Sequence, residues 1–219
     1  MGKPISTGQS HSVVQALSNN IDWSRVDSEA AQWVIEHAGE AEITAFINNR
    51  ARIIVGEPTI IQINRAKPFD PATFIGEGWS FWRGPADGDG LTGEIEQDAR
   101  SLALTEVDIT KTSLKTCLSE GKKWIEGEEF LRRLRATENI LLDAGVFQTF
   151  WENPYLHPQK WKEKTNGNLT RVFFTGSVLR GPRGNRCILY LYWHDGRLDW
   201  DCRWLGDKWD SRNPVAVLA

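Results

Sequence analysis

The chain has 219 residues, of which 40% are hydrophobic and 25% charged, a composition typical of one good-sized globular domain with room for a small appendage. The formal net charge of -3 gives no overall positive field, so we expect no nucleic-acid partner. No run of about 18 apolar residues is present and residues 1–14 lack the apolar segment of a signal peptide, so we expect neither a membrane span nor secretion by that route.

Residues 1–66 are expected to form a small appendage of helices and one hairpin. Three segments have apolar side chains at helical spacing: residues 11–20, 27–38 and 43–49. The stretch 51–65, ARIIVGEPTIIQINR, has two runs rich in Ile around a Gly-Glu-Pro turn, the pattern of two strands. Residues 67–71, KPFDP, mark the junction with a second domain at 67–219.

A glycine-rich loop opens the second domain. Its acidic residues at 87–94 do not have the spacing of a helix-loop-helix calcium site, so an exposed loop without a metal is expected. Residues 101–109, SLALTEVDI, have the alternation of a strand.

Three helices are predicted next, at 111–119, 127–136 and 141–153. The apolar face is Leu114, Cys117 and Leu118 in the first helix, and Phe130, Leu131 and Leu134 in the second. An Asn166-Gly167 turn follows. Residues 171–186 then predict a hairpin with Gly176-Ser177 at its tip and a basic lip of Arg180, Arg183 and Arg186. Helices followed by short strands predict an α+β fold.

The segment 187–204, CILYLYWHDGRLDWDCRW, predicts a second hairpin turned by Asp195-Gly196. With His194 opposite Arg197, the side-chain period of two fixes the register. It pairs Trp193 with Leu198, Tyr192 with Asp199, Leu191 with Trp200, Tyr190 with Asp201 and Leu189 with Cys202.

This register separates two faces of the hairpin. An apolar face is expected in the core: Cys187, Leu189, Leu191, Trp193, Leu198, Trp200, Cys202 and Trp204. The opposite face mixes tyrosines with charged and polar groups: Tyr190, Tyr192, His194, Arg197, Asp199, Asp201 and Arg203. Tyrosine beside short polar residues is typical of an adaptable binding surface; an ordinary solvent-exposed sheet face is the alternative.

The polar positions share a property of the genetic code. An asparagine codon altered only at its adenines can give His, Asp, Ser, Arg or Cys, but never Trp, Lys, Glu, Gln or Met. The reachable positions are His194, Asp195, Arg197, Asp199, Asp201, Cys202, Arg203, Asp207, Asp210, Ser211, Arg212 and Asn213. Most residues between them are Trp, Leu, Pro, Val or Ala, which need no adenine. Lys208 departs from the pattern because it is not reachable. Leu198 and Cys202 depart from it because they are reachable yet assigned to the core.

The segment LYWHDGRLDWDCRWLGDKWDSRNPVAVLA resembles the variable region of proteins diversified by retroelements, in which error-prone reverse transcription randomises template adenines. The resemblance implies a C-type lectin-like domain at 67–219, of the formylglycine-generating-enzyme subtype, with a variable region at about 190–213. Together with the tyrosines it implies a surface that binds a protein or another surface ligand. The expected ligand-binding residues are Tyr190, Tyr192, His194, Asp195, Arg197, Asp199, Asp201, Arg203, Asp207, Asp210, Ser211, Arg212 and Asn213.

No catalytic residue, metal or cofactor is expected in this reading, but alternatives remain. Trp193-His194-Asp195 is similar to the Trp-Asn-Asp element of calcium-dependent sugar-binding lectins, although their Glu-Pro-Asn element is absent. Cys187 and Cys202 are the candidates for the copper-binding cysteine pair of formylglycine-generating enzymes. Both are expected on the apolar face, and neither is closely spaced with Cys117, so inert free thiols are favoured. A structural protein of a phage or envelope is a further alternative. Localisation is cytoplasmic by default, with surface or phage display as the other possibility.

Overall fold

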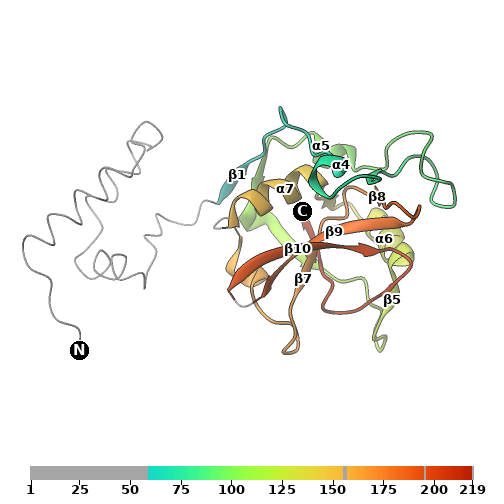
Figure 1. Ribbon diagram of the computed structural model, residues 1–219. Coiled ribbons are helices and arrows are strands. Elements are labelled where there is room, and N and C mark those ends of the chain that lie inside the picture. Colours follow the sequence, from blue (N-terminus) through green and yellow to red (C-terminus); the bar gives the residue numbers. More distant parts are fainter. Residues whose placement is uncertain (1–58, 155–156, 195, 219) are drawn as a thin grey trace, which may run out of the picture. The chain divides into compact units, whose positions relative to one another are not determined.

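The computed structural model describes residues 59–154, 157–194 and 196–218. The chain divides into two compact units, 1–57 and 58–219, and the described residues belong to the second (Figure 1). The helices expected within 11–49 and the first strand expected in 51–65 lie outside the described residues.

The described unit is an α+β fold, as predicted, with short helices and many strands. The helices are α4 (Pro71–Phe74), α5 (Ala99–Leu102), α6 (Gly127–Arg135) and α7 (Ala144–Glu152), with 3-10 turns η2 (Ile109–Lys111) and η4 (Gln159–Trp161). The strands are β1 (Ile60–Gln62), β2 (Ser80–Phe81), β3 (Glu106–Asp108), β4 (Thr112–Lys115), β5 (Ile125–Glu126), β6 (Ile140–Leu141), β7 (Arg171–Phe173), β8 (Leu179–Arg180), β9 (Arg186–His194), β10 (Arg197–Trp204), β11 (Lys208–Trp209) and β12 (Val215–Leu218). Among the described residues, no helix combines the length and apolar character needed to cross a membrane.

Strand β9 organises an eight-stranded sheet. β10 pairs with it along one edge, and β7 and β8 follow one another along the other edge. The hairpin predicted around Gly176-Ser177 is therefore wrong, because β7 and β8 pair with β9 and not with each other. The segment between them is held elsewhere: the Gly176 amide donates to the Leu142 carbonyl, and a side chain at Gly176 would collide with the Leu141 carbonyl.

The apolar C-terminal strand β12 lies inside the same sheet. It pairs with β4 on one side, and with β6 and β7 on the other. Val215, Ala216 and Val217 have no exposed surface, so these apolar residues belong to the core.

Two predictions of secondary structure are wrong, and the long-range pairing of β12 explains the first of them. Residues 111–119 are not a helix: 112–115 form strand β4, because hydrogen bonds to β12 outweigh the helical spacing of three apolar side chains. Residues 101–109 are not one strand: Asp98 accepts a hydrogen bond from the Arg100 amide and starts the short helix α5, and strand only begins at Glu106.

The sheet is covered on both faces, which gives the unit two apolar clusters. α7 packs on one face, where Val146, Phe147 and Phe150 meet Leu189 and Leu191. α6 belongs to the cluster on the opposite face, which also contains Ile188 and Tyr190. The predicted buried face of α6, made of Phe130, Leu131 and Leu134, is confirmed.

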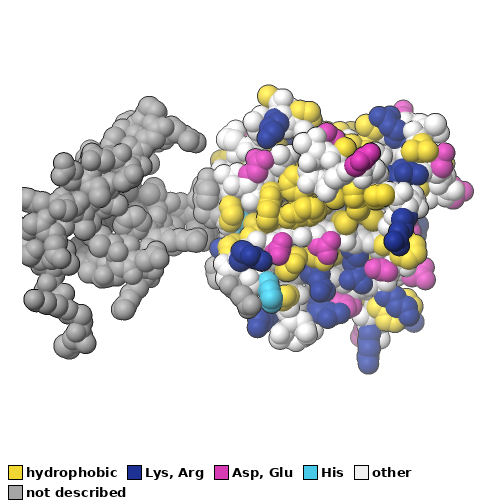
Figure 2. Space-filling model, viewed as in Figure 1, with side chains coloured by type: hydrophobic (Ala, Val, Ile, Leu, Met, Phe, Trp, Pro, Cys, Tyr) yellow, Lys and Arg dark blue, Asp and Glu magenta, His cyan; other side chains and the backbone are white. Residues whose placement is uncertain are grey.

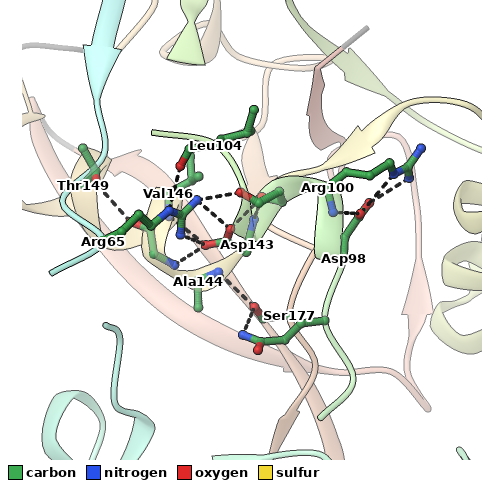
Figure 3. Close-up of polar contacts among 12 residues, drawn as sticks. Arg65, Asp98, Arg100, Leu104, Asp143, Ala144, Val146, Thr149 and Ser177 are labelled. Carbon is green, nitrogen blue, oxygen red and sulfur yellow. Dashed lines mark hydrogen bonds and ion pairs between the residues drawn. The ribbon is translucent and has the colours of Figure 1, made fainter. Parts of the chain in front are cut away.

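A buried carboxylate joins the start of α7 to two distant segments (Figure 3). Asp143 accepts hydrogen bonds from the amides of Gly145 and Val146 at 2.6 and 3.1 Å, which caps the helix. The Ser101 hydroxyl and the Arg65 guanidinium also donate to this carboxylate, at 2.7 Å and at 2.9 and 3.0 Å. Arg65, within the stretch 1–66 assigned to the appendage, is thus bound to the core of the described unit, and Ile60–Gln62 pair with β3.

Candidate ligand-binding surface

The hairpin formed by β9 and β10 has the predicted register. Arg197 lies opposite His194, Asp199 opposite Tyr192, and Asp201 opposite Tyr190. Gly196 has φ of 75°, the left-handed conformation that a tight turn requires and that glycine adopts without strain. Asp195 lies outside the described residues.

The inner face of the hairpin is apolar and mostly buried, as predicted, except at its end. Leu189, Leu191 and Leu198 are buried, and the half-buried Trp200 ring lies 4.8 Å from the Phe74 ring. Trp204 was expected in the core, but it is 51% exposed. β10 pairs with no strand other than β9 in the described part of the chain, and at this free edge the Trp204 ring packs over Gly206, where a Cβ would lie 2.6 Å away.

Tyr190 was expected on the ligand-facing surface, and this prediction is wrong because the residue is only 8% exposed. Its ring lies 4.7 Å from the Phe173 ring, in the apolar cluster shared with α6. Its hydroxyl donates to the Asp201 carboxylate at 3.1 Å. Burial and the nearby Asp201 charge raise the pKa of Tyr190 above its usual value.

Asn213 is also buried, so it does not reach the surface expected of it. The Asn213 side-chain oxygen accepts a hydrogen bond from the Asp210 backbone amide at 2.9 Å. In return, the Asn213 backbone amide donates to the Asp210 carbonyl. This reciprocal pair closes the turn before β12. Asn213 therefore shapes the loop and does not contact a ligand directly.

The other described members of the predicted site are exposed or half-buried. We call the surface that they form the charged face; its residues are Tyr192, His194, Arg197, Asp199, Asp201, Arg203, Asp207, Asp210, Ser211 and Arg212. Figure 2, in the same view as Figure 1, shows side chains of both charge signs over the hairpin and a band of hydrophobic side chains beside them. The hydrophobic band lies on the α4 side of the hairpin.

Ion pairs link neighbours within the charged face. Arg212 lies 2.6 Å from Asp210, and Arg203 lies 3.7 Å from Asp207. Hydrogen bonds from Arg212 hold the pKa of Asp210 below its usual value. The loop after β10 is therefore charged at neutral pH and braced by its own side chains.

Two carboxylates of the charged face satisfy the backbone at the free edge of β10. Asp199 accepts a hydrogen bond from the Trp200 amide at 2.9 Å, and Asp201 accepts one from the Cys202 amide at 2.7 Å. These amide groups are consequently not free to pair with another strand. Charged groups that occupy an edge in this way oppose association through β-strand addition.

Arg171 belongs to this surface but was missed by the sequence reasoning. β7 places it opposite Tyr192, and its amide donates to the Arg212 carbonyl at 2.9 Å. Its charge acts on both Tyr190 and Tyr192. No sequence signal identifies Arg171, because the neighbour of β9 on this side is set by long-range pairing.

The structure gives structural roles to Lys208 and to Arg186 of the predicted basic lip. The Lys208 ammonium lies 4.1 Å from the centre of the Trp124 ring, a cation–π contact. Arg186 is buried, not on a lip: its guanidinium bonds to Glu96 and Glu128 and stacks over Trp82. Arg186 is therefore not available to a ligand.

The cysteines are free thiols. Cys187 is buried, and both its hydrogen bond with Cys202 and its desolvation raise its pKa. The same bond lowers the pKa of Cys202, which is half-buried. Among the described residues, no group of three or more His, Cys, Asp and Glu side chains is arranged to hold a metal ion.

Comparisons with protein-family models, with curated proteins and with solved structures gave no match.

Proposed function

We propose that this chain is a ligand-binding protein whose charged face is the variable surface, diversified by a retroelement and displayed on a C-type lectin-like scaffold. The observation that carries the proposal is the alternation along β9 and β10. The bulky apolar side chains of the hairpin pack inward except for Trp204, while the polar residues that are reachable from asparagine codons point outward.

The backbone contacts of the charged face support tolerance to change. Asp199 and Asp201 bond through one side-chain oxygen to the amide that follows, and asparagine or serine also provides such an oxygen. Both are reachable from an asparagine codon. Arg197, at the hairpin turn, has an 81% exposed side chain, so its replacement leaves no cavity.

Residues that the mutational mechanism would leave unchanged form the support beneath the charged face. Leu189 and Leu191 lie in the core, and the ring centres of Trp209 and Phe173 lie 4.2 Å apart. Lys208, the residue that the mutational mechanism would not produce, holds Trp124 and has a structural contact to preserve. A surface of changeable groups on a rigid support is what a diversified binding site requires.

The arrangement of helices and terminal strand supports the choice of scaffold. The apolar C-terminal strand β12 pairs with β4 from the first half of the unit, and α6 and α7 lie on opposite faces of the sheet. The resemblance of the last thirty or so residues to variable regions adds the subtype to the proposal.

A DNA comparison tests the diversification directly. We expect a near-copy of the segment encoding residues 190–213 beside a reverse transcriptase gene, with differences confined to positions where the copy has adenine. A copy that differs equally at all four bases, or the absence of any copy, would contradict the proposal.

A selection experiment tests ligand binding. A library with Arg197, Asp199, Asp201 and Asp207 encoded by NNY codons is displayed and selected against an immobilised test protein. The matched control library varies Glu120, Lys122, Lys123 and Glu138 in the same way, all of them exposed and outside the charged face. Binders are expected from the first library alone; equal yields from both would count against a dedicated surface.

A further inference from the structure

The turn predicted at Asn166 and Gly167 is present between η4 and β7, outside the charged face. The Thr165 amide donates to the Asn168 carbonyl at 2.9 Å, and the Asn168 amide donates to the Thr165 carbonyl at 3.0 Å. The two residues between them have φ of 51° and 77°, which asparagine and glycine accept in a two-residue turn. The backbone geometry of the turn thus explains why this dipeptide stands at its tip.

The reactive groups of the dipeptide are accessible. Asn166 and Gly167 are both exposed, and a Cβ built on Gly167 would meet nothing within 4 Å. The hydrogen bond that Asn166 accepts from the Asn168 side chain, at 3.0 Å, uses its backbone carbonyl. Within the described part of the chain, the Asn166 side-chain amide and the Gly167 backbone N–H make no hydrogen bond.

An asparagine side chain can react with the backbone nitrogen of the residue that follows it. The nitrogen attacks the side-chain carbonyl carbon, a new C–N bond closes a five-membered succinimide, and the side-chain nitrogen leaves as ammonia. Water then opens the ring at either carbonyl and gives aspartate or isoaspartate, in which the chain runs through the side-chain carboxyl. The sum consumes one water and releases one ammonia, with no oxidant or metal.

Glycine is the following residue that favours this ring closure, because it has no side chain to block the approach and its backbone rotates freely. The chain contains Asn-Gly once, at 166–167. Asn168 is the comparison within the same turn, since it is also exposed but is followed by Leu169.

We propose that Asn166 is a site of spontaneous covalent modification, at which the Gly167 nitrogen forms a succinimide that water opens to aspartate and isoaspartate. Asparagine is among the thermolabile residues of proteins, and this one combines the reactive successor with an exposed, unengaged side chain. The inference does not rest on the proposed function.

The modification would change the surface at the turn and leave the fold intact. Either product adds one negative charge to a chain of net charge -3, and isoaspartate also adds one carbon to the backbone of the turn. Below the tip, the Thr170 hydroxyl donates to the Glu163 carbonyl at 2.6 Å and accepts from the Thr165 hydroxyl at 2.7 Å. Because these bonds close the base of the loop, the modified protein is expected to keep the melting temperature of fresh protein.

Peptide mapping of the folded full chain after incubation at 37 °C, at pH 7 and pH 8.5, tests this proposal. Trypsin releases residues 165–171, TNGNLTR, so one peptide reports on Asn166 and Asn168 together; fresh protein digested in parallel corrects for reaction during digestion. Conversion of Asn166 is expected to be at least tenfold faster than that of Asn168 and to yield both aspartate and isoaspartate. It is also expected to be several-fold faster at pH 8.5, because base removes the proton from the attacking nitrogen.

Two controls separate the effect of the turn from the effect of the dipeptide. The same peptide, purified from fresh protein and incubated free, gives the rate without the fold, and the folded chain is expected to react within fivefold of it. Asn166→Gln, whose longer side chain would need a six-membered ring, is expected to abolish conversion at this position. The proposal is overturned if Asn166 stays intact in the folded chain while the free peptide converts, if aspartate is the sole product, or if Asn168 converts as fast.

Discussion

The buried imidazole of His157 makes a quantitative prediction about acid stability. The side chain is 3% exposed and lies among Phe150, Trp161 and Trp193, with ring centroids 5.3 to 5.9 Å away. Desolvation lowers the pKa of His157 to about 4 from an ordinary 6.5, and the charge of Lys162 acts in the same direction. The folded protein therefore keeps this imidazole neutral where the unfolded chain protonates it.

The difference between the pKa values of His157 in the folded and unfolded states sets the sign and size of the change in stability with pH. Below pH 6.5 the unfolded state binds a proton that the folded state does not, so stability is lost as pH falls from about 6.5 to about 4 and is regained as pH rises. Between pH 7 and pH 5 the loss from this one group is about 2 kcal/mol, and the full loss near pH 4 is about 3 kcal/mol.

Urea unfolding of the parent and of His157→Gln at pH 7 and pH 5 measures this contribution. Carboxylates titrate equally in both proteins and cancel in the comparison. The parent is expected to lose about 2 kcal/mol more than the variant on acidification. Equal pH dependence of the parent and His157→Gln would refute the assignment of a buried neutral imidazole.

Three further substitutions test the core. Asp143→Ala removes the cap of α7 and leaves Arg65 without its carboxylate. Chemical denaturation is expected to show a decrease of about 4 kcal/mol in the free energy of unfolding. A decrease below about 1 kcal/mol would show that the network in Figure 3 is not cooperative. Trp200→Ala empties the space beside Phe74 and is expected to cost about 3 kcal/mol, measured the same way; a neutral result would place Trp200 in solvent. Gly176→Ala is expected to lower the melting temperature by more than about 8 °C, because its Cβ would collide with the Leu141 carbonyl; an unchanged melting temperature would contradict this close approach.

The hairpin was predictable because its determinants are local. The Asp195-Gly196 turn and the alternation of side chains fix which residue faces which, and no distant segment changes that register. The helix at Gly127–Arg135 was predictable for the same reason, since Phe130, Leu131 and Leu134 mark one face of a single element.

The features that could not be predicted from the sequence depend on contacts between distant segments. The outer face of β9 is half-buried at Tyr192 but buried at Tyr190, whose ring packs against Phe173. β4 became a strand because β12 pairs with it, and Arg171 joined the charged face because β7 pairs with β9. Periodicity along one segment contains no information on such partners.

A comparison of stabilities across the hairpin tests the central claim most directly. The outer variant combines Arg197→Ser, Asp199→Asn and Asp201→Asn. The inner variant is Leu191→Ala, a buried residue of the neighbouring strand β9. Urea unfolding is expected to show a change below about 1 kcal/mol for the outer variant and a loss of about 2 to 5 kcal/mol for the inner one. Equal losses in the two variants would contradict a division into a rigid inner face and a changeable outer face.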